Sequence, residues 1–357
     1  MYYLVAILLW LTLTTISSGV YAFQLSHIHL NSPIYYKHQQ TTNQRSQLYS
    51  ALGELSGIEY EGSVFRPPAE WRSLILQVTI GCSWNRCTFC EMYQDKEFRA
   101  RPIDDIIKEM DLVVNAGGAR HVRDVFLADG DAMTLPTSRL ELILDAINDR
   151  FPRVRRISSY CLPRNIRRKS VDSLSKLKSK GLSLVYVGCE SGSDKVLDAI
   201  SKGETYASSL TALQKLHDAG IKRSVMILVG LGGKEYSNEH AIQSAALCNE
   251  AVPDYLSLLT TSFPRGKDRV IEGYSNADSP SSFQELSTHD LLVEMKTFLE
   301  STSLPQKGRT IFRSDHASNY LVLKGRLGRD KERLLAELQV ALDGDTSNIR
   351  KEWQRGL

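Results

Sequence analysis

The sequence predicts an α/β fold, because apolar β-rich segments alternate with amphipathic helical segments from residue 74 to about residue 262. Such alternation is typical of right-handed βαβ units around a parallel sheet. The expected strands cover residues 74–80, 124–127, 156–160, 183–187, 224–229 and 255–259. The expected helices cover residues 103–115, 138–149, 170–179, 205–219 and 237–250. Six strands are too few for a full eight-stranded barrel, so we expect a partial (β/α)6 barrel.

The first expected helix illustrates the pattern. Its apolar residues recur at offsets of three, four and seven, which places them on one side of a helix. They are Ile103, Ile106, Ile107, Met110, Val113 and Val114. Pro102 precedes the helix at a favourable position, and Gly117 and Gly118 follow as a stop signal.

Beyond Pro264 the alternation lapses. We expect a helix from residue 283 or 289 to residue 300, a strand at 310–312 and a helix at 329–342. These elements are expected to cover the open edge of the sheet. The sequence therefore predicts a core barrel at residues 73–265 and a C-terminal extension at residues 266–357.

The amino terminus has the composition of a targeting segment. Residues 4–16 are apolar, and the small residues Val20 and Ala22 suit cleavage by signal peptidase before Phe23. No Asp or Glu occurs from Met1 to Gly53, which is typical of a transit peptide. We expect a signal peptide at residues 1–22 and a transit peptide with linker at 23–72. The apolar run is short for a membrane span, although an uncleaved anchor is an alternative, and no later stretch is long enough.

This arrangement resembles the bipartite presequence of algae with complex plastids, and the resemblance implies a plastid protein. Simple secretion is the alternative. Oxidising compartments turn neighbouring thiols into disulfides, so the cysteine cluster described next favours a reducing destination. The formal charge of +3 for 357 residues is too small to indicate nucleic-acid binding.

Three cysteines, Cys82, Cys87 and Cys90, follow the first expected strand within nine residues. Their spacing does not suit a disulfide scaffold, and thiolates this close can converge on one metal centre. Three thiolates around a four-iron cluster would leave one iron without a protein ligand. The alternative is a structural zinc site, which needs four ligands; the closest other candidate, His121, lies about thirty residues away.

Polar and glycine-rich segments close three other strands. Asp129, Gly130 and Asp131 follow the second strand, and Glu190 and Ser191 follow the fourth. The turn after the fifth strand contains Gly230, Gly232 and Gly233. Carboxylates accept hydrogen bonds from ammonium or hydroxyl groups, and glycine lets a backbone come close to a ligand. Parallel α/β folds place their sites at this end of the strands, although each segment alone also suits an ordinary turn.

The cysteine loop resembles that of the radical S-adenosylmethionine (radical SAM) superfamily. The family pattern is Cys-x3-Cys-x2-Cys with an aromatic before the third cysteine, which Phe89 matches. The first interval here, from Cys82 to Cys87, is one residue longer. The resemblance implies that Cys82, Cys87 and Cys90 bind a [4Fe-4S] cluster whose fourth iron chelates S-adenosylmethionine. Glu190 and Ser191 resemble a segment of the branch that includes tRNA-modifying enzymes.

The resemblance also implies roles for the other strand ends. Asp129, Gly130 and Asp131 occupy the position that contacts the ammonium group of the cofactor. Glu190 and Ser191 contact its ribose or amino group, and the turn from Gly230 to Gly233 leaves room for its adenine. The implied protein is an enzyme that cleaves the cofactor reductively and abstracts hydrogen from a substrate that the sequence does not identify.

An electron donor such as ferredoxin or flavodoxin is also implied. The alternative is a non-catalytic iron–sulfur or zinc scaffold. Four further residues are open candidates. Arg99 and Arg101 either hold a carboxylate or phosphate or are solvated surface residues. Cys161 is either a reactive thiol or a small residue at a strand end, and His316 either reaches the substrate or is structural.

Overall fold

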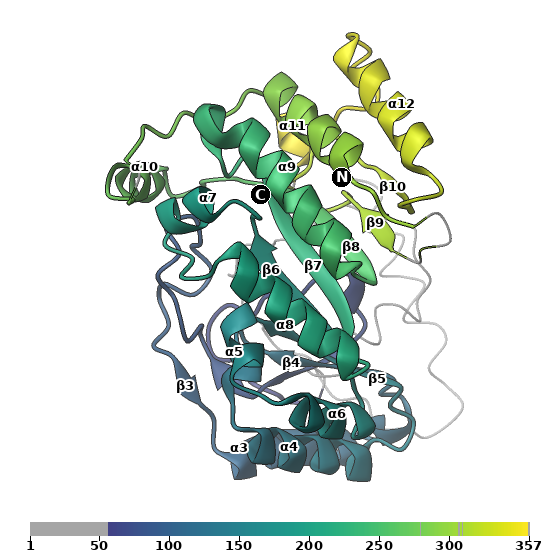
Figure 1. The fold of residues 1–357 in the computed structure, drawn as a ribbon. Coiled ribbons are helices and arrows are strands. Elements are labelled where there is room, and N and C mark those ends of the chain that lie inside the picture. The colour runs from purple at the N-terminus through teal and green to yellow at the C-terminus, as the bar shows by residue number, and fades with distance from the viewer. Residues whose placement is uncertain (1–55, 279, 306–307, 309, 356–357) are drawn as a thin grey trace, which may run out of the picture. The chain divides into compact units, whose positions relative to one another are not determined.

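The computed structural model describes residues 56–278, 280–305, 308 and 310–355 (Figure 1). The predicted signal peptide, its cleavage site and residues 23–55 of the predicted transit peptide lie outside the described residues. Element labels follow Figure 1.

An eight-stranded sheet forms the centre of the described region, in the order β1-β4-β5-β6-β7-β8-β9-β10. The strands from β1 to β9 are parallel to their neighbours, and β10 is antiparallel to β9. Their bounds are β1 Leu74–Gln77, β4 Asp124–Ala128, β5 Arg156–Cys161, β6 Leu182–Glu190, β7 Lys222–Val229, β8 Tyr255–Thr260, β9 Ile311–Arg313 and β10 Lys324–Arg326. Because β1 and β10 are the two ends of this order, the sheet is open. The predicted α/β fold with an open parallel sheet is confirmed. The six predicted strands of the barrel are present, and β9, which was expected in the C-terminal extension, joins them as a seventh parallel strand.

Helices connect the strands, as the alternation predicted. The larger ones are α3 Ile103–Asn115, α4 Thr137–Arg150, α6 Val171–Ser179, α8 Tyr206–Asp218, α9 Gly233–Ala251, α11 Thr288–Ser301 and α12 Lys331–Leu342. Shorter helices are α5 Pro163–Arg167, α7 Asp194–Ala199 and α10 Asp268–Ser275. The bounds of α3 equal the predicted ones, since Pro102 precedes its first turn and Gly117 adopts a left-handed conformation after its end.

The first predicted strand is the main correction. It divides into β1 and β2 (Thr79–Ile80), and β2 pairs with β3 (Arg99–Ala100) in a separate two-stranded sheet. Val78 lies at the division, where its N–H donates to the carbonyl of Ala128 and its own carbonyl accepts from the N–H of Arg101. The chain after β1 therefore turns toward β3, and these two short strands frame the cysteine loop.

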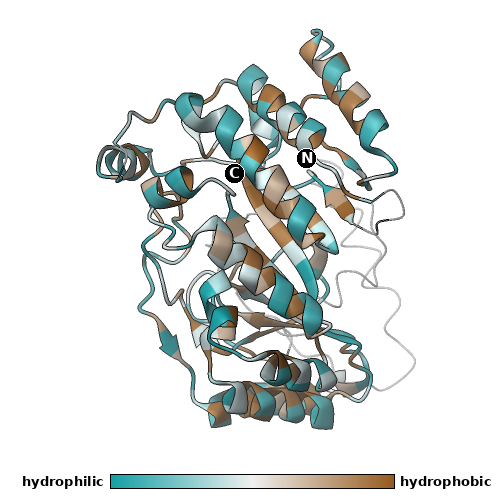
Figure 2. Cartoon of the chain, in the orientation of Figure 1, coloured by the Kyte–Doolittle hydropathy of each residue, from teal (hydrophilic) through white to brown (hydrophobic). Residues whose placement is uncertain are grey.

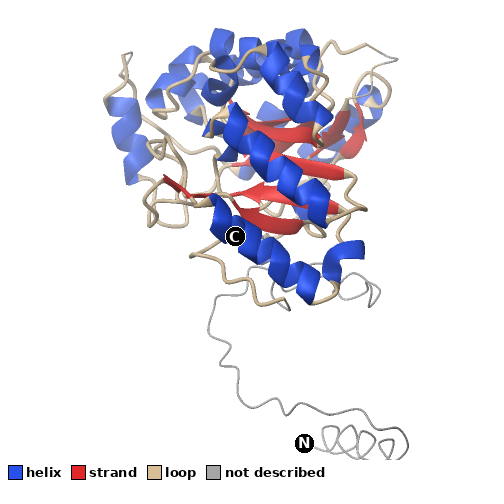
Figure 3. Cartoon of the chain, turned by 90° about the horizontal axis from the view of Figure 1, so that it is seen from below, coloured by secondary structure: helices blue, strands red, loops and turns tan. Residues whose placement is uncertain are grey.

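The two faces of the sheet have different partners. The main hydrophobic core lies between the sheet and the helices, and it includes Leu127, Val185 and Val225. A smaller cluster on the opposite face contains Phe126, Tyr160 and Tyr186, whose rings make edge contacts with centroids 5.1–6.2 Å apart. Figure 2 shows mainly hydrophobic strands and hydrophilic outer sides of the helices, and Figure 3 shows the strands between helices.

A buried carboxylate lies below this aromatic cluster. Glu70 is fully buried, and it accepts hydrogen bonds from Tyr186 (2.6 Å), Ser73 (2.5 Å) and Arg156 (3.1 Å). Arg156 is the first residue of β5, so this network lies near the amino ends of the strands. The cysteine loop and the other predicted site residues lie at the opposite, carboxyl ends.

The residues after β8 extend the sheet and add two helices. Helix α11 packs on α9, and α12 packs on α11 (Figure 1). The boundary between a core barrel and a C-terminal extension stays a prediction. Among the described residues, no helix has the length and apolar character that a membrane span requires.

Candidate functional site

The cysteine loop runs between β2 and β3 and carries the three predicted metal ligands. Cys87 is buried, whereas Cys82 and Cys90 are partly buried. Burial raises the pKa of all three thiols, and that of Cys87 rises to about 12. The three thiols interact electrostatically with one another. Thiols with raised pKa values stay protonated at neutral pH unless a metal binds them.

One buried cation faces these thiols. Lys202 is only 3 % exposed, and its charge lowers the pKa of Cys82, Cys87 and Cys90 against the effect of burial. Burial lowers the pKa of Lys202 itself, but Glu190 and Cys87 raise it more, so this ammonium stays charged. The sequence analysis missed Lys202, because nothing in the segment Ser201–Glu204 distinguishes it from a surface turn.

The extra residue between Cys82 and Cys87 is accommodated by a left-handed turn. Asn85 has a φ of 44°, a conformation that Asn tolerates better than most residues. Its side-chain amide donates to the carbonyl of Tyr93 (2.7 Å), which ties the two halves of the loop together. The backbone N–H groups of Trp84 and Asn85 donate to the sulfur of Cys82. The longer interval is therefore compatible with a loop that stabilises a thiolate at Cys82.

Asp129 anchors the start of this loop. Its fully buried carboxylate accepts hydrogen bonds from the N–H of Gly81 (3.0 Å) and from Gln77 (3.1 Å), and it pairs with Lys96 (2.9 Å). The structure therefore places Asp129, a predicted cofactor contact, in internal bonds that join β4, β1 and both ends of the loop. Lys96, which the sequence analysis missed, is the buried cation that balances this carboxylate.

Two other segments hold the far side of the loop. The guanidinium of Arg269, on α10, donates to the carbonyls of Cys90 (3.0 Å) and Cys87 (3.1 Å). The N–H of Thr88 donates to the carbonyl of Ile200, at the end of α7 (2.9 Å). Arg269 thus fixes the backbone of two predicted ligands that lie 179 and 182 positions away in the chain. No sequence pattern predicted this contribution of Arg269.

Gly130 and Asp131 lie beside the thiols. A Cβ at Gly130 would lie 2.5 Å from the ring of Tyr93, so only glycine allows that ring to pack here. The Tyr93 hydroxyl is buried without a hydrogen-bond partner in the described structure, and Tyr93 interacts electrostatically with Cys82 and Cys90. Burial raises the pKa of Asp131 to about 6, although Ser83 donates a hydrogen bond to it. Buried polar atoms normally have partners, so an unpaired hydroxyl beside the cysteines suits a site that binds a polar ligand.

Glu190 and Lys202 form a buried ion pair beside the thiols, with 2.9 Å between Oε1 and Nζ. Glu190 has a φ of 65° at a β-bulge in β6, a sparsely populated conformation for a side chain of this size. Its carboxylate folds back over Gly188, where an added Cβ would lie 2.2 Å from Oε1. Strained residues of this kind concentrate at functional sites. Glu190 also raises the pKa of Cys87 and Cys90, so the structure places it near two of the three thiols.

Ser191 and the glycine turn lie in a second network. The buried Ser191 hydroxyl bonds Nδ1 of His240 (2.7 Å), and Nε2 of His240 donates to the carbonyl of Leu228 (3.0 Å). The N–H of Gly230 donates to Glu294 of α11 (2.6 Å), and Gly232 and Gly233 begin α9. The adjacent N–H of Lys234 donates to the carbonyl of Gln284 (2.8 Å). The glycine turn is thus packed against residues from the C-terminal part of the chain.

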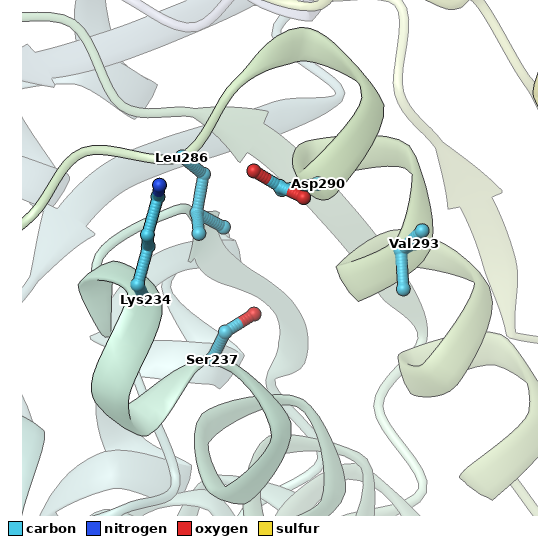
Figure 4. Close-up of a pocket in the computed structure, with 5 residues that line it drawn as sticks. All are labelled: Lys234, Ser237, Leu286, Asp290 and Val293. Carbon is cyan, nitrogen blue, oxygen red and sulfur yellow. The ribbon is translucent and has the colours of Figure 1, made fainter.

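A shallow pocket of about 300 Å³ lies beside this network, between α9 and α11 (Figure 4). Lys234, Ser237, Leu286, Asp290 and Val293 line it. Ser237 also donates a hydrogen bond to the buried carboxyl of Glu294. No cysteine lines this pocket, so it is separate from the thiol site.

Glu294 gives this region a specific pH dependence. Burial raises the pKa of Glu294 to about 7 and lowers that of the neighbouring His240 to about 4, so both are neutral near pH 6 and their 3.6 Å contact is no ion pair. A carboxyl whose pKa rises on folding stabilises the protein below its unfolded pKa, and this stabilisation is lost as pH increases through the folded value.

We therefore expect Glu294→Gln, which keeps the shape and does not titrate, to gain stability relative to the native chain between pH 5 and pH 8. The gain is at most about 3 kcal/mol. Urea unfolding of both proteins at the two pH values measures it. An equal difference in unfolding free energy at pH 5 and pH 8 would contradict the burial of an ionisable carboxyl here.

The remaining candidates lie in structural contacts. Arg99 pairs with Glu61 at the surface, and Arg101 pairs with Glu109 (2.7 Å) and donates to the carbonyl of Gln77. Cys161 is buried at the end of β5 and interacts electrostatically with Asp131. His316 accepts at Nδ1 from the N–H of Ser318 (3.1 Å), within the loop that follows β9.

The three cysteines differ in how well they suit a single zinc ion and a four-iron cluster. Within the described residues, no three His, Cys, Asp or Glu side chains are close enough together to hold a single metal ion. Thiolates that share one zinc ion bind it at about 2.3 Å each, which requires tight convergence. A four-iron cluster separates its ligands, because each thiolate binds a different iron. One buried and two partly buried thiols near Lys202, with no fourth cysteine among them, fit the cluster better than the ion.

Comparison with known proteins agrees with this geometry. Residues 76–245 match the family model described as the radical SAM superfamily. The chain therefore contains a radical SAM domain, the kind of domain that uses a [4Fe-4S] cluster and S-adenosylmethionine. The matched residues include the whole cysteine loop, Asp131, Glu190, Lys202 and the glycine turn.

Curated relatives match only part of the chain. A tRNA-2-methylthio-N(6)-dimethylallyladenosine synthase of Thiobacillus denitrificans is 28% identical over 186 residues, which cover 49% of this chain and 40% of the relative. A 4'-phospho-dehydrooxetanocin synthase of Priestia megaterium is 24% identical over 164 residues, which cover 42% and 22%. The chain thus spans less than half the length of these relatives. Among solved structures, coproporphyrinogen III oxidase (HemN) of Escherichia coli matches with a TM-score of 0.47 and 19% identity, covering 64% of this chain and 52% of that one.

Proposed function

We propose that this protein is a radical SAM enzyme that abstracts a hydrogen atom from a substrate. The single observation that carries the proposal is the cysteine loop, in which three thiols without a fourth cysteine lie beside the Glu190–Lys202 pair. When bound, the cluster would supply one electron for cleavage of the carbon–sulfur bond of S-adenosylmethionine, so that methionine and, after transfer of one hydrogen atom from the substrate, 5′-deoxyadenosine would form.

The residues of the chain supply binding, orientation and exclusion of water. Cys82, Cys87 and Cys90 would hold three irons, and Lys202 would balance part of the negative charge of their thiolates. Glu190 is held in place by Lys202 and presents a carboxylate to hydroxyl or amino groups of the cofactor. Asp131, whose pKa is about 6 and which interacts electrostatically with Cys82, would add a second acceptor.

The substrate would approach from the aromatic face of the sheet. Tyr160 and Met226 lie on this face and are partly exposed, whereas the other face is covered by helices. The amino ends of the strands are filled by the Glu70 network, so access is from the carboxyl ends. A tRNA substrate is one candidate, because the relative from Thiobacillus denitrificans is named for one.

Anaerobic reconstitution with iron and sulfide, followed by a chemical reductant and S-adenosylmethionine, tests the proposal. We expect equal amounts of methionine and 5′-deoxyadenosine. A protein that takes up zinc and no iron–sulfur cluster, and forms neither product, would instead be the metal-binding scaffold considered above.

We also propose that the protein works in a plastid, which the acid-poor segment before Glu54 and the need for reduced thiols support. A fluorescent fusion of residues 1–60 tests this localisation, with secretion into the medium as the contradicting result.

A further inference from the structure

Four arginines surround the outer side of the cysteine loop. Arg86 belongs to the loop, Arg164 to α5, and Arg265 and Arg269 to the segment at the start of α10. We refer to these four residues as the arginine rim. Each has a recorded contact with the loop, through the ring of Trp84, the side chain of Glu91 or the carbonyls of Cys87 and Cys90.

Trp84 lies between two arginines of the rim, Arg86 and Arg164. It is partly exposed between Cys82 and Cys87, and its indole N–H donates to the carbonyl of Ser201 (2.8 Å). The guanidinium carbon of Arg164 lies 3.7 Å from the ring centroid, and that of Arg86 lies 5.2 Å from it. The contacts of the ring and of Arg164 hold this aromatic and cationic surface in a defined position directly over the thiol loop.

The charge of the rim is only partly balanced. Two carboxylates pair with the rim among the described residues, Glu91 and Glu204, and the side chain of Glu204 is 1% exposed. Arg86 is exposed and forms no ion pair in the described part of the chain, and Arg265 is 62% exposed and 4.0 Å from Glu91. The exposed acids Asp95, Glu97 and Asp268 also belong to the loop or to the start of α10, so the positive surface is local to Arg86 and Arg265. Exposed charges of one sign raise the local concentration of partners of opposite charge.

We propose that the arginine rim is the docking surface for an acidic iron–sulfur electron-transfer protein. The proposal rests on the proposed function, since it needs a cluster at the cysteine loop. Electron transfer slows steeply with distance, so a donor must approach where that loop reaches the surface. Arg86 is exposed and Trp84 is partly exposed, and both lie between Cys82 and Cys87. Electron-transfer encounters use small interfaces and depend on charge for association rate. A small acidic donor fits both properties of the rim.

The test measures reduction of the cluster directly, with a plant-type [2Fe–2S] ferredoxin as donor. Stopped-flow absorbance follows the bleaching of the cluster in the native protein and in Arg86→Glu and Arg265→Glu. We expect each reversal to lower the second-order rate constant about three- to tenfold at low salt. The native rate is also expected to fall as salt rises. Arg86→Lys, which keeps the charge, is expected to stay within about twofold of the native rate.

Two controls separate docking from damage to the cluster. Lys108→Glu changes net charge equally at an exposed site on α3, where Lys108 is 75% exposed, and should leave the rate unchanged. Photoreduced 5-deazariboflavin, a small uncharged reductant, should reduce all variants equally and support equal formation of 5′-deoxyadenosine.

The two proposals fail in different ways. Ferredoxin rates that are unaffected by Arg86→Glu and Arg265→Glu would overturn the docking surface, whatever other anion the rim binds. Equal losses with both reductants would also overturn it, because the variants would then act on the cluster. Absence of 5′-deoxyadenosine from the native protein with deazaflavin would overturn the proposed function instead.

Discussion

Replacing Cys87 with alanine is expected to remove the iron–sulfur cluster and reductive cleavage of S-adenosylmethionine together. Cys87 is the most buried of the three thiols, and its carbonyl is held by Arg269. With one ligand lost, two irons of a four-iron cluster would lack a protein thiolate, and such clusters depend on their thiolates. Iron analysis and a 5′-deoxyadenosine assay after anaerobic reconstitution measure the result.

Cys248→Ala is the matched control. Cys248 is a fully buried thiol on α9, and we expect this variant to retain iron and activity. Cluster binding or cofactor cleavage that survives in Cys87→Ala would refute the assignment of Cys87 as a ligand.

Lys202→Met is expected to have the second-largest effect, on both stability and cluster content. It leaves the carboxylate of Glu190 buried without its partner, and breaking a buried pair in this way costs about 3–5 kcal/mol. It also removes the cation that lowers the pKa of all three thiols. We expect a lower free energy of unfolding in urea. We also expect at least about tenfold less cofactor cleavage per chain, because a loss of ~1.4 kcal/mol of binding free energy already lowers an equilibrium constant tenfold.

A second variant separates these two effects. In Lys202→Met with Glu190→Gln no charge is left unpaired, so about half or more of the lost stability should return. Cluster content should stay low, because the cation is still absent. Cofactor cleavage does not separate the two effects, since Glu190→Gln also removes a proposed contact to the cofactor. Lys195→Met, at an exposed lysine on α7 that pairs with Glu239, should change neither stability nor cluster content. Recovery of cluster content in the double variant would show that Lys202 acts only on stability.

Periodicity predicted most of the fold because each βα unit buries one side of a helix against the sheet. Helix α3 matches its predicted bounds, since apolar spacing, Pro102 and Gly117 all agree. The predicted end of the first strand was wrong, because an apolar run does not show where a strand leaves its sheet. The break at Val78 depends on a hydrogen bond to the carbonyl of Ala128. Helix α9 starts at Gly233, four residues before its predicted start, because glycine at the first position weakens the helical pattern.

In the candidate site, too, the sequence predicted residues that share one loop but not residues that act through long-range contacts. Cys82, Cys87 and Cys90 could be found because one loop carries them with a recognisable spacing. Lys202, Lys96 and Arg269 could not, because their roles depend on contacts with residues 12 to 182 positions away. Asp129 and Ser191 lie at strand ends, as expected, but the structure uses their side chains in internal hydrogen bonds.

In the proposed site, three thiolates hold a four-iron cluster with one iron left for the cofactor. Mössbauer spectroscopy of protein reconstituted with ⁵⁷Fe, with and without S-adenosylmethionine, tests this arrangement directly. We expect about one quarter of the iron signal to shift when the cofactor binds, because one iron of the four lacks a protein thiolate. A cluster whose four irons are all unchanged by the cofactor, or a protein that binds no iron–sulfur cluster, would contradict it.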